Sequence, residues 1–180
     1  MRFRNSENDY GLVAILFHWL IAALVFIQLG IGIYVDDLPI SLARLQWLSR
    51  HKATGFVILV LVLARLAWRL VNPAPALPGS MAHWERRIAH ATHWLLYGLL
   101  ITAPLAGWLH ADAAGLGVNV FGLFSVPDLM PKNRQVSEMF HDVHVVLVAA
   151  LAVLLLLHVA AALRHALLRD GVFGRMLPWK

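Results

Sequence analysis

The sequence contains no cysteine among its 180 residues. Disulfide bonds, thiolate zinc sites and iron–sulfur clusters are therefore excluded, and so is the C-x-x-C-H motif that attaches c-type haem covalently. Charged residues are also scarce, at 14%, against about 25% in an average soluble domain. The net charge of +5 comes with no nucleic-acid-binding motif, so we expect no nucleic-acid partner. Such a composition indicates a surface that largely faces lipid.

Hydrophobic residues make up 60% of the chain and gather in runs close to or above the ~20 residues that a helix needs to cross a bilayer. These runs are Leu12–Val35, Ala53–Val71, His93–Ala111 and Val143–Leu168. The first run is too long for a signal peptide, so we expect it to be a retained helix. The sequence predicts an all-α fold, an integral membrane four-helix bundle that forms a single domain over residues 1–180. The long loop before the last run contains FGLFSVPDLMP, which is typical of an interfacial segment.

The distribution of lysine and arginine predicts the orientation. With four crossings, both termini and the middle loop share one side, which holds ten of the fifteen basic residues. The other five are Arg44, Arg50, Lys52, Lys132 and Arg134. The positive-inside rule then places both termini of this multi-pass membrane protein in the cytoplasm.

Two histidines on the last apolar run share one helix face. His144 and His158 are fourteen residues apart, which at about 100° per residue ends only ~40° short of whole turns, with a rise of ~21 Å. Titratable rings inside a membrane helix need partners that compensate for their burial. His18 lies at the depth of His158, and His51 at the depth of His144, on neighbouring antiparallel helices. The two rings of each depth-matched pair could bind one flat macrocycle from opposite sides.

Neutral imidazole is a good ligand for iron, and two imidazoles fill both axial positions of a haem. We therefore predict two non-covalent b haems, with His18, His51, His144 and His158 as axial ligands. His93 lies at a depth where it competes with His18 as a ligand. The alternative is that the rings are hydrogen-bonded within the bundle or line a proton path.

Three basic residues lie beside these levels, where a guanidinium or an ammonium could bind a haem carboxylate. Arg50 and Lys52 flank His51, and Arg65 lies near the cytoplasmic end of the second run. We predict that all three contact the cofactor, although the positive-inside bias alone accounts equally well for Arg65. Close approach of a backbone or a haem edge would be eased by several glycines. These are Gly30, Gly32, Gly55, Gly98 and Gly107.

The chain resembles the bacterial dihaem cytochrome b561 family. The resemblance rests on FHWLIAALVF, on HKATG, on AHATHWLLYGLLITAPLAGW, and on a closing helix that ends near GRMLP, and it covers residues 8 to 178. It implies a four-helix protein of the bacterial inner membrane in which His18 with His158 and His51 with His144 bind two b haems. Members that resemble this chain include superoxide oxidases, and others pass electrons to or from redox partners.

From the histidine pairs and this resemblance we expect transmembrane electron transfer. The predicted donor is superoxide or another periplasmic redox donor, and the predicted acceptor is ubiquinone from the quinone pool. An enzyme of the superoxide:quinone oxidoreductase type follows, although the sequence identifies no catalytic residue. Two alternatives stay open: a haem b subunit that serves a partner dehydrogenase, and a haem-free transporter or channel.

Overall fold

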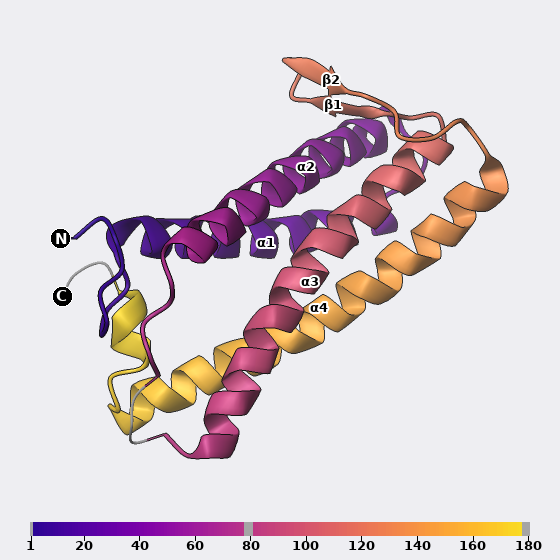
Figure 1. The fold of residues 1–180 in the computed structure, drawn as a ribbon. Helices are drawn as coiled ribbons and strands as arrows, with labels where there is room; N and C mark the ends of the chain where they lie inside the picture. Colours follow the sequence, from indigo (N-terminus) through magenta and orange to yellow (C-terminus); the bar gives the residue numbers. More distant parts are fainter. Residues whose placement is uncertain (1, 78–80, 178–180) are drawn as a thin grey trace.

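The computed structural model describes residues 2–77 and 81–177. In this part of the chain, four helices are long and apolar enough to cross a membrane. They are α1 (Leu12–Asp37), α2 (Leu42–Val71), α3 (His83–Ala113) and α4 (Arg134–Leu168). Both termini lie at the same end of the helices (Figure 1), which we call the terminal side; the opposite end is the far side. The predicted all-helical membrane fold is confirmed.

Three of the helices begin well before the predicted apolar runs. Helix α2 begins at Leu42 rather than Ala53, because the Ser41 hydroxyl accepts a hydrogen bond from the Arg44 N–H at 3.2 Å. Asn133 caps α4 in the same way, through the N–H of Val136 at 3.2 Å. An apolar run marks only the part of a helix that lies in hydrocarbon, so hydropathy does not reveal turns that continue into the headgroup region. Capping side chains are the signal that locates the true helix starts.

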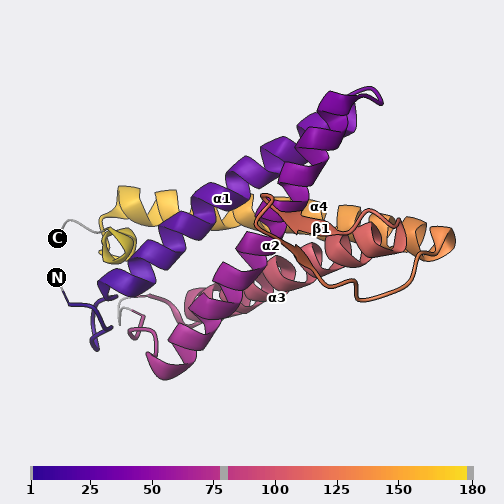
Figure 2. The same cartoon turned by 90° about the horizontal axis from the view of Figure 1, so that it is seen from above.

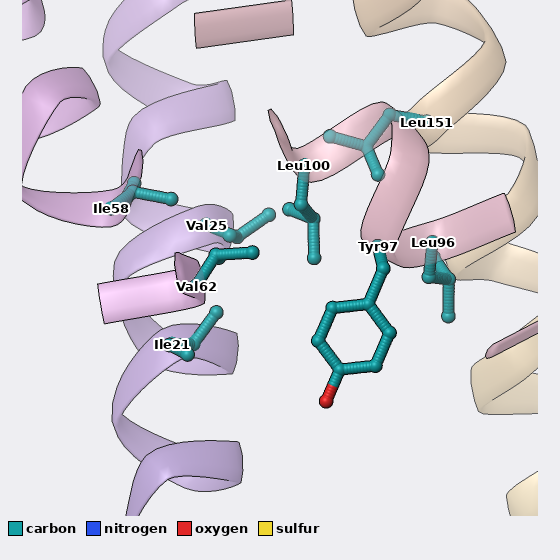
Figure 3. Close-up of a cluster of buried hydrophobic side chains, with 8 residues drawn as sticks. All are labelled: Ile21, Val25, Ile58, Val62, Leu96, Tyr97, Leu100 and Leu151. Atoms are coloured by element: carbon teal, nitrogen blue, oxygen red, sulfur yellow. The ribbon is translucent and has the colours of Figure 1, made fainter. Parts of the chain in front are cut away.

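The helices pack as two antiparallel pairs. Helix α1 packs against α2, α3 packs against α4, and α2 joins the pairs through α3. Figure 2 shows the far ends of α1 and α2 running together, away from the far ends of α3 and α4. A buried apolar cluster between the helices holds the pairs together (Figure 3). Its residues are Ile21, Val25, Ile58, Val62, Leu96, Tyr97, Leu100 and Leu151.

This cluster follows from helical spacing. Ile21 and Val25 are four residues apart on α1, and Ile58 and Val62 are four apart on α2, so each pair lies on one helix face. Lipid tails are as apolar as these side chains, so close van der Waals packing rather than exclusion of water stabilises the contact.

One element departs from the all-helical expectation. Strands β1 (Val118–Val120) and β2 (Phe124–Val126) form an antiparallel hairpin between α3 and α4. Its inward residues, Val118, Val120 and Val126, pack against Ala111 and Phe56. The alternation of valine with exposed residues is the period-two signal of a strand, but three-residue strands are too short for that signal to stand out in an apolar loop.

The segments at the terminal side are tied to one another. The indole N–H of Trp19 on α1 donates to the carbonyl of Met176 at 2.7 Å, in the short helix η1 (Phe173–Met176). The guanidinium of Arg175 donates to the carbonyl of Ala76 at 2.6 Å, between α2 and α3. At the N-terminus, the Asn5 amide donates to the carbonyl of Asn72 at 3.0 Å. The two ends of the described chain therefore close the same side of the bundle.

Candidate functional site

The far-side histidine pair joins two helices that are distant in sequence. His51 on α2 and His144 on α4 have ring centroids 6.2 Å apart, with their planes at 88°. Both rings are mostly enclosed, in a region where α1 and α3 supply the neighbouring backbone. The depth matching predicted for these two residues thus corresponds to a direct approach of their rings.

A backbone carbonyl fixes the orientation of His144. Its Nδ1 lies 2.8 Å from the carbonyl oxygen of Ala103 on α3. A carbonyl can only accept, so Nδ1 carries the proton and donates it, and the lone pair is left on Nε2. Metal-binding histidines are usually oriented in this way, with the second ring nitrogen donating to an oxygen.

Gly107 allows the His144 ring to approach this carbonyl closely. It lies four residues after Ala103, on the same face of α3, and a Cβ there would lie 3.1 Å from both Nδ1 and Cε1 of the His144 ring. Without a side chain at this position, the ring can reach a carbonyl that also takes part in the helix. The same arrangement recurs on α2, where the Gln28 amide donates to the carbonyl of His51 at 2.7 Å. Gly55, four residues after His51, leaves room for that amide, since a Cβ there would lie 3.3 Å from it.

The ring of His51 is held less firmly than that of His144. Its Nδ1 is buried and has no hydrogen-bond partner among the described residues. Gly32 on α1 lies against the ring, where a Cβ would be 3.3 Å from Cε1. Packing against helix α1, rather than a hydrogen bond to the ring, therefore positions this imidazole.

Three histidines meet near the terminal side. The rings of His18 and His158 have centroids 6.3 Å apart at 75°, and the rings of His93 and His158 have centroids 5.7 Å apart at 72°. His158 on α4 therefore lies between α1 and α3 and faces a candidate partner on each. Both rings are close enough to be candidate partners of His158.

Arg65 of α2 lies against this cluster. Its Nη2 is 3.4 Å from Nδ1 of His18, and its guanidinium lies 5.6 Å from the centroid of the Tyr97 ring. A guanidinium has no lone pair to offer, so here Nδ1 of His18 is the acceptor and the proton of the neutral ring is on Nε2. For His18 to bind a metal through Nε2, that proton must move and the long contact to Arg65 must be released.

The ring separations fit a metal held between two imidazoles. With a metal–nitrogen bond of about 2.0–2.1 Å and a ring nitrogen ~1.1 Å from its centroid, two axial rings have centroids about 6.3 Å apart. The measured separations are 6.2 and 6.3 Å. Among the described residues, no three His, Cys, Asp or Glu side chains are placed to hold a metal ion. Two imidazoles at this spacing are the donor set that a metal with further ligands of its own, such as the iron of a porphyrin, would need.

The basic residues beside the pairs have different surroundings. The ammonium of Lys52 donates to the carbonyls of Leu116 and Gly117 at 2.9 and 2.7 Å, so it ties the loop after α3 to α2. Arg50 is exposed, with its guanidinium 4.7 Å from the centroid of the Trp47 ring. Together with Arg65, these two residues stay predicted contacts of the cofactor.

A further histidine stabilises the end of α4. His165 forms a short hydrogen bond with the carboxyl of Asp170, just after the helix ends. Partial burial would raise the pKa of the Asp170 carboxyl, but the hydrogen bond from His165 and the backbone N–H of Val172 outweigh it, so the pKa lies below its ordinary value. This contact fixes the segment that leads to η1.

Two hydrogen-bond partners of the histidine pairs were not predicted from the sequence. Gln28 is the one amide within the apolar part of α1, and that isolation inside a membrane span could have marked it as a structural contact. The carbonyl of Ala103 carries no signal of its own, because every residue has one. Only the position of Gly107 one turn later hints that this carbonyl can be reached.

The sequence matches a known protein family over most of its length. The model of one protein family, described as prokaryotic cytochrome b561, matches residues 9–179. Cytochrome b561 homolog 2 of Escherichia coli K12 is 29% identical over 182 residues, covering 98% of this chain and 95% of the relative. The probable superoxide oxidase CybB of Yersinia pestis is 29% identical over 176 residues, covering 97% and 98%.

Proposed function

Because the chain belongs to the prokaryotic cytochrome b561 family, we propose that it carries electrons across the inner membrane between two b haems. Members of this family are haem b proteins that transfer electrons in membranes. The proposed axial ligands are His18 with His158 on the terminal side and His51 with His144 on the far side. The observation that carries this proposal is the separation of the two ring pairs, 6.3 and 6.2 Å.

His144 and His18 have different hydrogen-bond partners, which leave different ring nitrogens with the proton. The carbonyl of Ala103 holds the Nδ1 proton of His144, so the Nε2 lone pair is directed away from α3 and is available for coordination. We propose that Arg65 leaves His18 and binds a haem carboxylate instead, which would free Nδ1 of His18 to carry the ring proton. A bound haem would supply a centre that accepts and releases one electron at a time. Held by two imidazoles, each haem would carry electrons rather than bind oxygen.

Superoxide is the proposed donor, and ubiquinone is the proposed acceptor. Two superoxide anions would each lose one electron and leave as dioxygen, while the quinone would take two electrons and two protons and become a quinol. The printed name of the Yersinia pestis relative supports this donor. The excess of lysine and arginine on the terminal side supports cytoplasmic termini, and hence a periplasmic far side.

The basic residues of the far side differ in how well they could attract superoxide electrostatically. Arg134 is paired with Glu138 at 2.8 Å, and Lys52 is engaged by two carbonyls. Arg50 and Lys132 are exposed cations on this side, and we propose that Arg50, which is adjacent to His51 in the sequence, attracts the small anion to this pair. We expect Arg50→Gln to slow haem reduction by superoxide about tenfold at low ionic strength and less at high salt. The double variant Arg134→Gln/Glu138→Gln, which removes an ion pair of no net charge, should leave the rate nearly unchanged.

The haem ligands are tested by a quantitative pyridine haemochrome assay on the purified protein. We expect two b haems per chain, and the loss of one in each of the His18→Ala, His51→Ala, His144→Ala and His158→Ala variants. His93→Ala should keep both haems. A single haem in the wild type, or loss of a haem on replacing His93, would contradict the proposed pairing.

The donor is tested separately by stopped-flow spectroscopy. Submicromolar holoprotein is mixed with excess superoxide and a soluble ubiquinone, and reduction of the haem bands is followed. We expect reduction faster than spontaneous dismutation removes superoxide. If reduction is no faster, superoxide is not the donor, and a redox partner protein takes its place.

A further inference from the structure

The loop between α3 and α4 contains an unusually long stretch without charge. Residues 113–127 include no Asp, Glu, Lys or Arg, and they contain both strands of the hairpin. The large apolar side chains at its turn point outward: Phe121 is 58% exposed, Leu123 80% and Phe124 53%. A water-facing turn would normally carry polar residues there.

The polar groups of this turn are paired within the hairpin. The Asn119 amide donates to the Ser125 hydroxyl at 3.1 Å, and its oxygen accepts from the N–H of Gly122 at 2.6 Å. The N–H of Leu123 donates to the carbonyl of Val120 at 2.9 Å. Internal pairing lowers the cost of moving a turn out of water, because unpaired polar groups are expensive to bury.

The hairpin lies beside α2 rather than beyond its end. In both ribbon views it runs alongside the helices, short of their far ends (Figures 1 and 2). The ring of Phe124 is 6.4 Å from that of Phe56, fourteen residues into α2, and Phe56 also packs against Trp108 at 5.5 Å. Tryptophan and other aromatic rings gather at the level of the lipid headgroups.

The hairpin surface continues the lipid-facing surface of α2. Val60 and Leu63 follow Phe56 by four and seven residues, so the three share one helix face. Val60 is 49% exposed and Leu63 is 46% exposed, as expected for side chains in contact with lipid. Because Phe124 covers Phe56 at the head of this face, the hairpin borders the hydrocarbon.

The base of the hairpin is polar and firmly attached. Lys52 holds the carbonyls of Leu116 and Gly117, and the carboxylate of Asp112 accepts from the N–H of Leu129 at 2.7 Å. The charged groups thus lie at the base while the turn itself is apolar. This is the polarity gradient of an element that rests in the membrane interface.

We propose that the β1–β2 hairpin is a lipid anchor that inserts Phe121, Leu123 and Phe124 at the boundary between headgroups and acyl chains on the far side of the bilayer. The anchor fixes the loop that Lys52 ties to α2, one residue after His51. The lipid contact depends only on the hairpin and its position, and does not depend on which molecule donates electrons.

The natural absence of cysteine allows a direct test. Single Leu123→Cys, Asp37→Cys and Leu156→Cys variants of the holoprotein carry a nitroxide label in nanodiscs of phosphatidylethanolamine and phosphatidylglycerol. Power-saturation electron paramagnetic resonance then compares accessibility to oxygen, which prefers lipid, with accessibility to a water-soluble nickel chelate. Asp37 is exposed at the end of α1, so its label reports the accessibility of a site in water. Leu156 is a 72% exposed side chain within α4, so its label reports the accessibility of a site in lipid.

We expect the label at Leu123 to show an oxygen-to-nickel accessibility ratio several-fold above that of Asp37 and close to that of Leu156. Adding Phe121→Asp should shift the ratio toward that of Asp37, because a carboxylate pulls the turn into water. A Leu123 label with the ratio of Asp37 would overturn the anchor. A label shielded from both reagents, with dipolar broadening between copies, would also overturn it and indicate a dimer contact.

Discussion

Replacing Gly107 with alanine should weaken binding of the proposed far-side haem while leaving the fold intact. The new Cβ would lie 3.1 Å from two atoms of the His144 ring, so the ring must retreat by a few tenths of an ångström from its 2.8 Å hydrogen bond to Ala103. Weakening this bond costs at most about 1 kcal/mol. The alanine itself favours the helix by a similar amount, about 1 kcal/mol, so the melting temperature should barely change.

The effect on cofactor binding should be larger than the effect on stability. Loss of an outer-shell partner of a histidine ligand typically reduces metal affinity 10–100-fold. Because the bond is stretched rather than removed, we expect the lower end, about tenfold, which corresponds to about 1.4 kcal/mol. The assay is the rate at which haem transfers from the protein to excess apomyoglobin, together with the haem stoichiometry after purification.

Gly98→Ala is the matched control for this experiment. Gly98 lies on the same helix, and a Cβ there would meet nothing within 4 Å. This variant should keep wild-type haem transfer rates and gain the same helix propensity. If Gly107→Ala transfers haem no faster than Gly98→Ala, the glycine does not position His144 for coordination, and the reasoning from the carbonyl contact fails.

Three further outcomes are expected. Gly32→Ala should increase haem transfer less than Gly107→Ala does, because Nδ1 of His51 has no hydrogen bond to a described residue that could be lost. Gly30→Ala, whose Cβ would meet no atom of the described residues within 4 Å, should have no effect; equal transfer rates for Gly32→Ala and Gly30→Ala would contradict the contact between Gly32 and His51. Asp170 has a lowered pKa, so its contribution should be constant above about pH 4 and disappear as the pH falls through that lowered pKa. Hydrogen exchange of residues 170–177 should show this loss, and Asp170→Asn should abolish the pH dependence while reducing protection at pH 7 by less than about 1 kcal/mol; an unaltered profile in that variant would assign the pH dependence to another group. Lys52→Met should raise hydrogen exchange in the loop at 115–118, whereas unchanged exchange would mean that its two hydrogen bonds do not restrain the loop.

Much of the fold followed from patterns within the chain. Apolar runs of sufficient length predicted the four membrane helices, because hydrocarbon requires every backbone group to be paired within its own helix. Their starts were predicted too late, since Ser41 and Asn133 cap turns outside the apolar runs. The hairpin was not predicted, because an apolar loop that packs on α2 through valines resembles any other interfacial segment.

The sequence by itself determined that the chain is a membrane protein of four helices without cysteine, because these properties depend on composition and on the length of the apolar runs. Only the tertiary structure showed which rings approach one another. It placed His158 between His18 and His93, at 6.3 and 5.7 Å, so depth alone does not separate these partners. It also showed that a carbonyl of α3 holds His144. Such contacts join helices far apart in sequence, and they depend on the packing angles and close approaches that glycine permits, which no local pattern encodes.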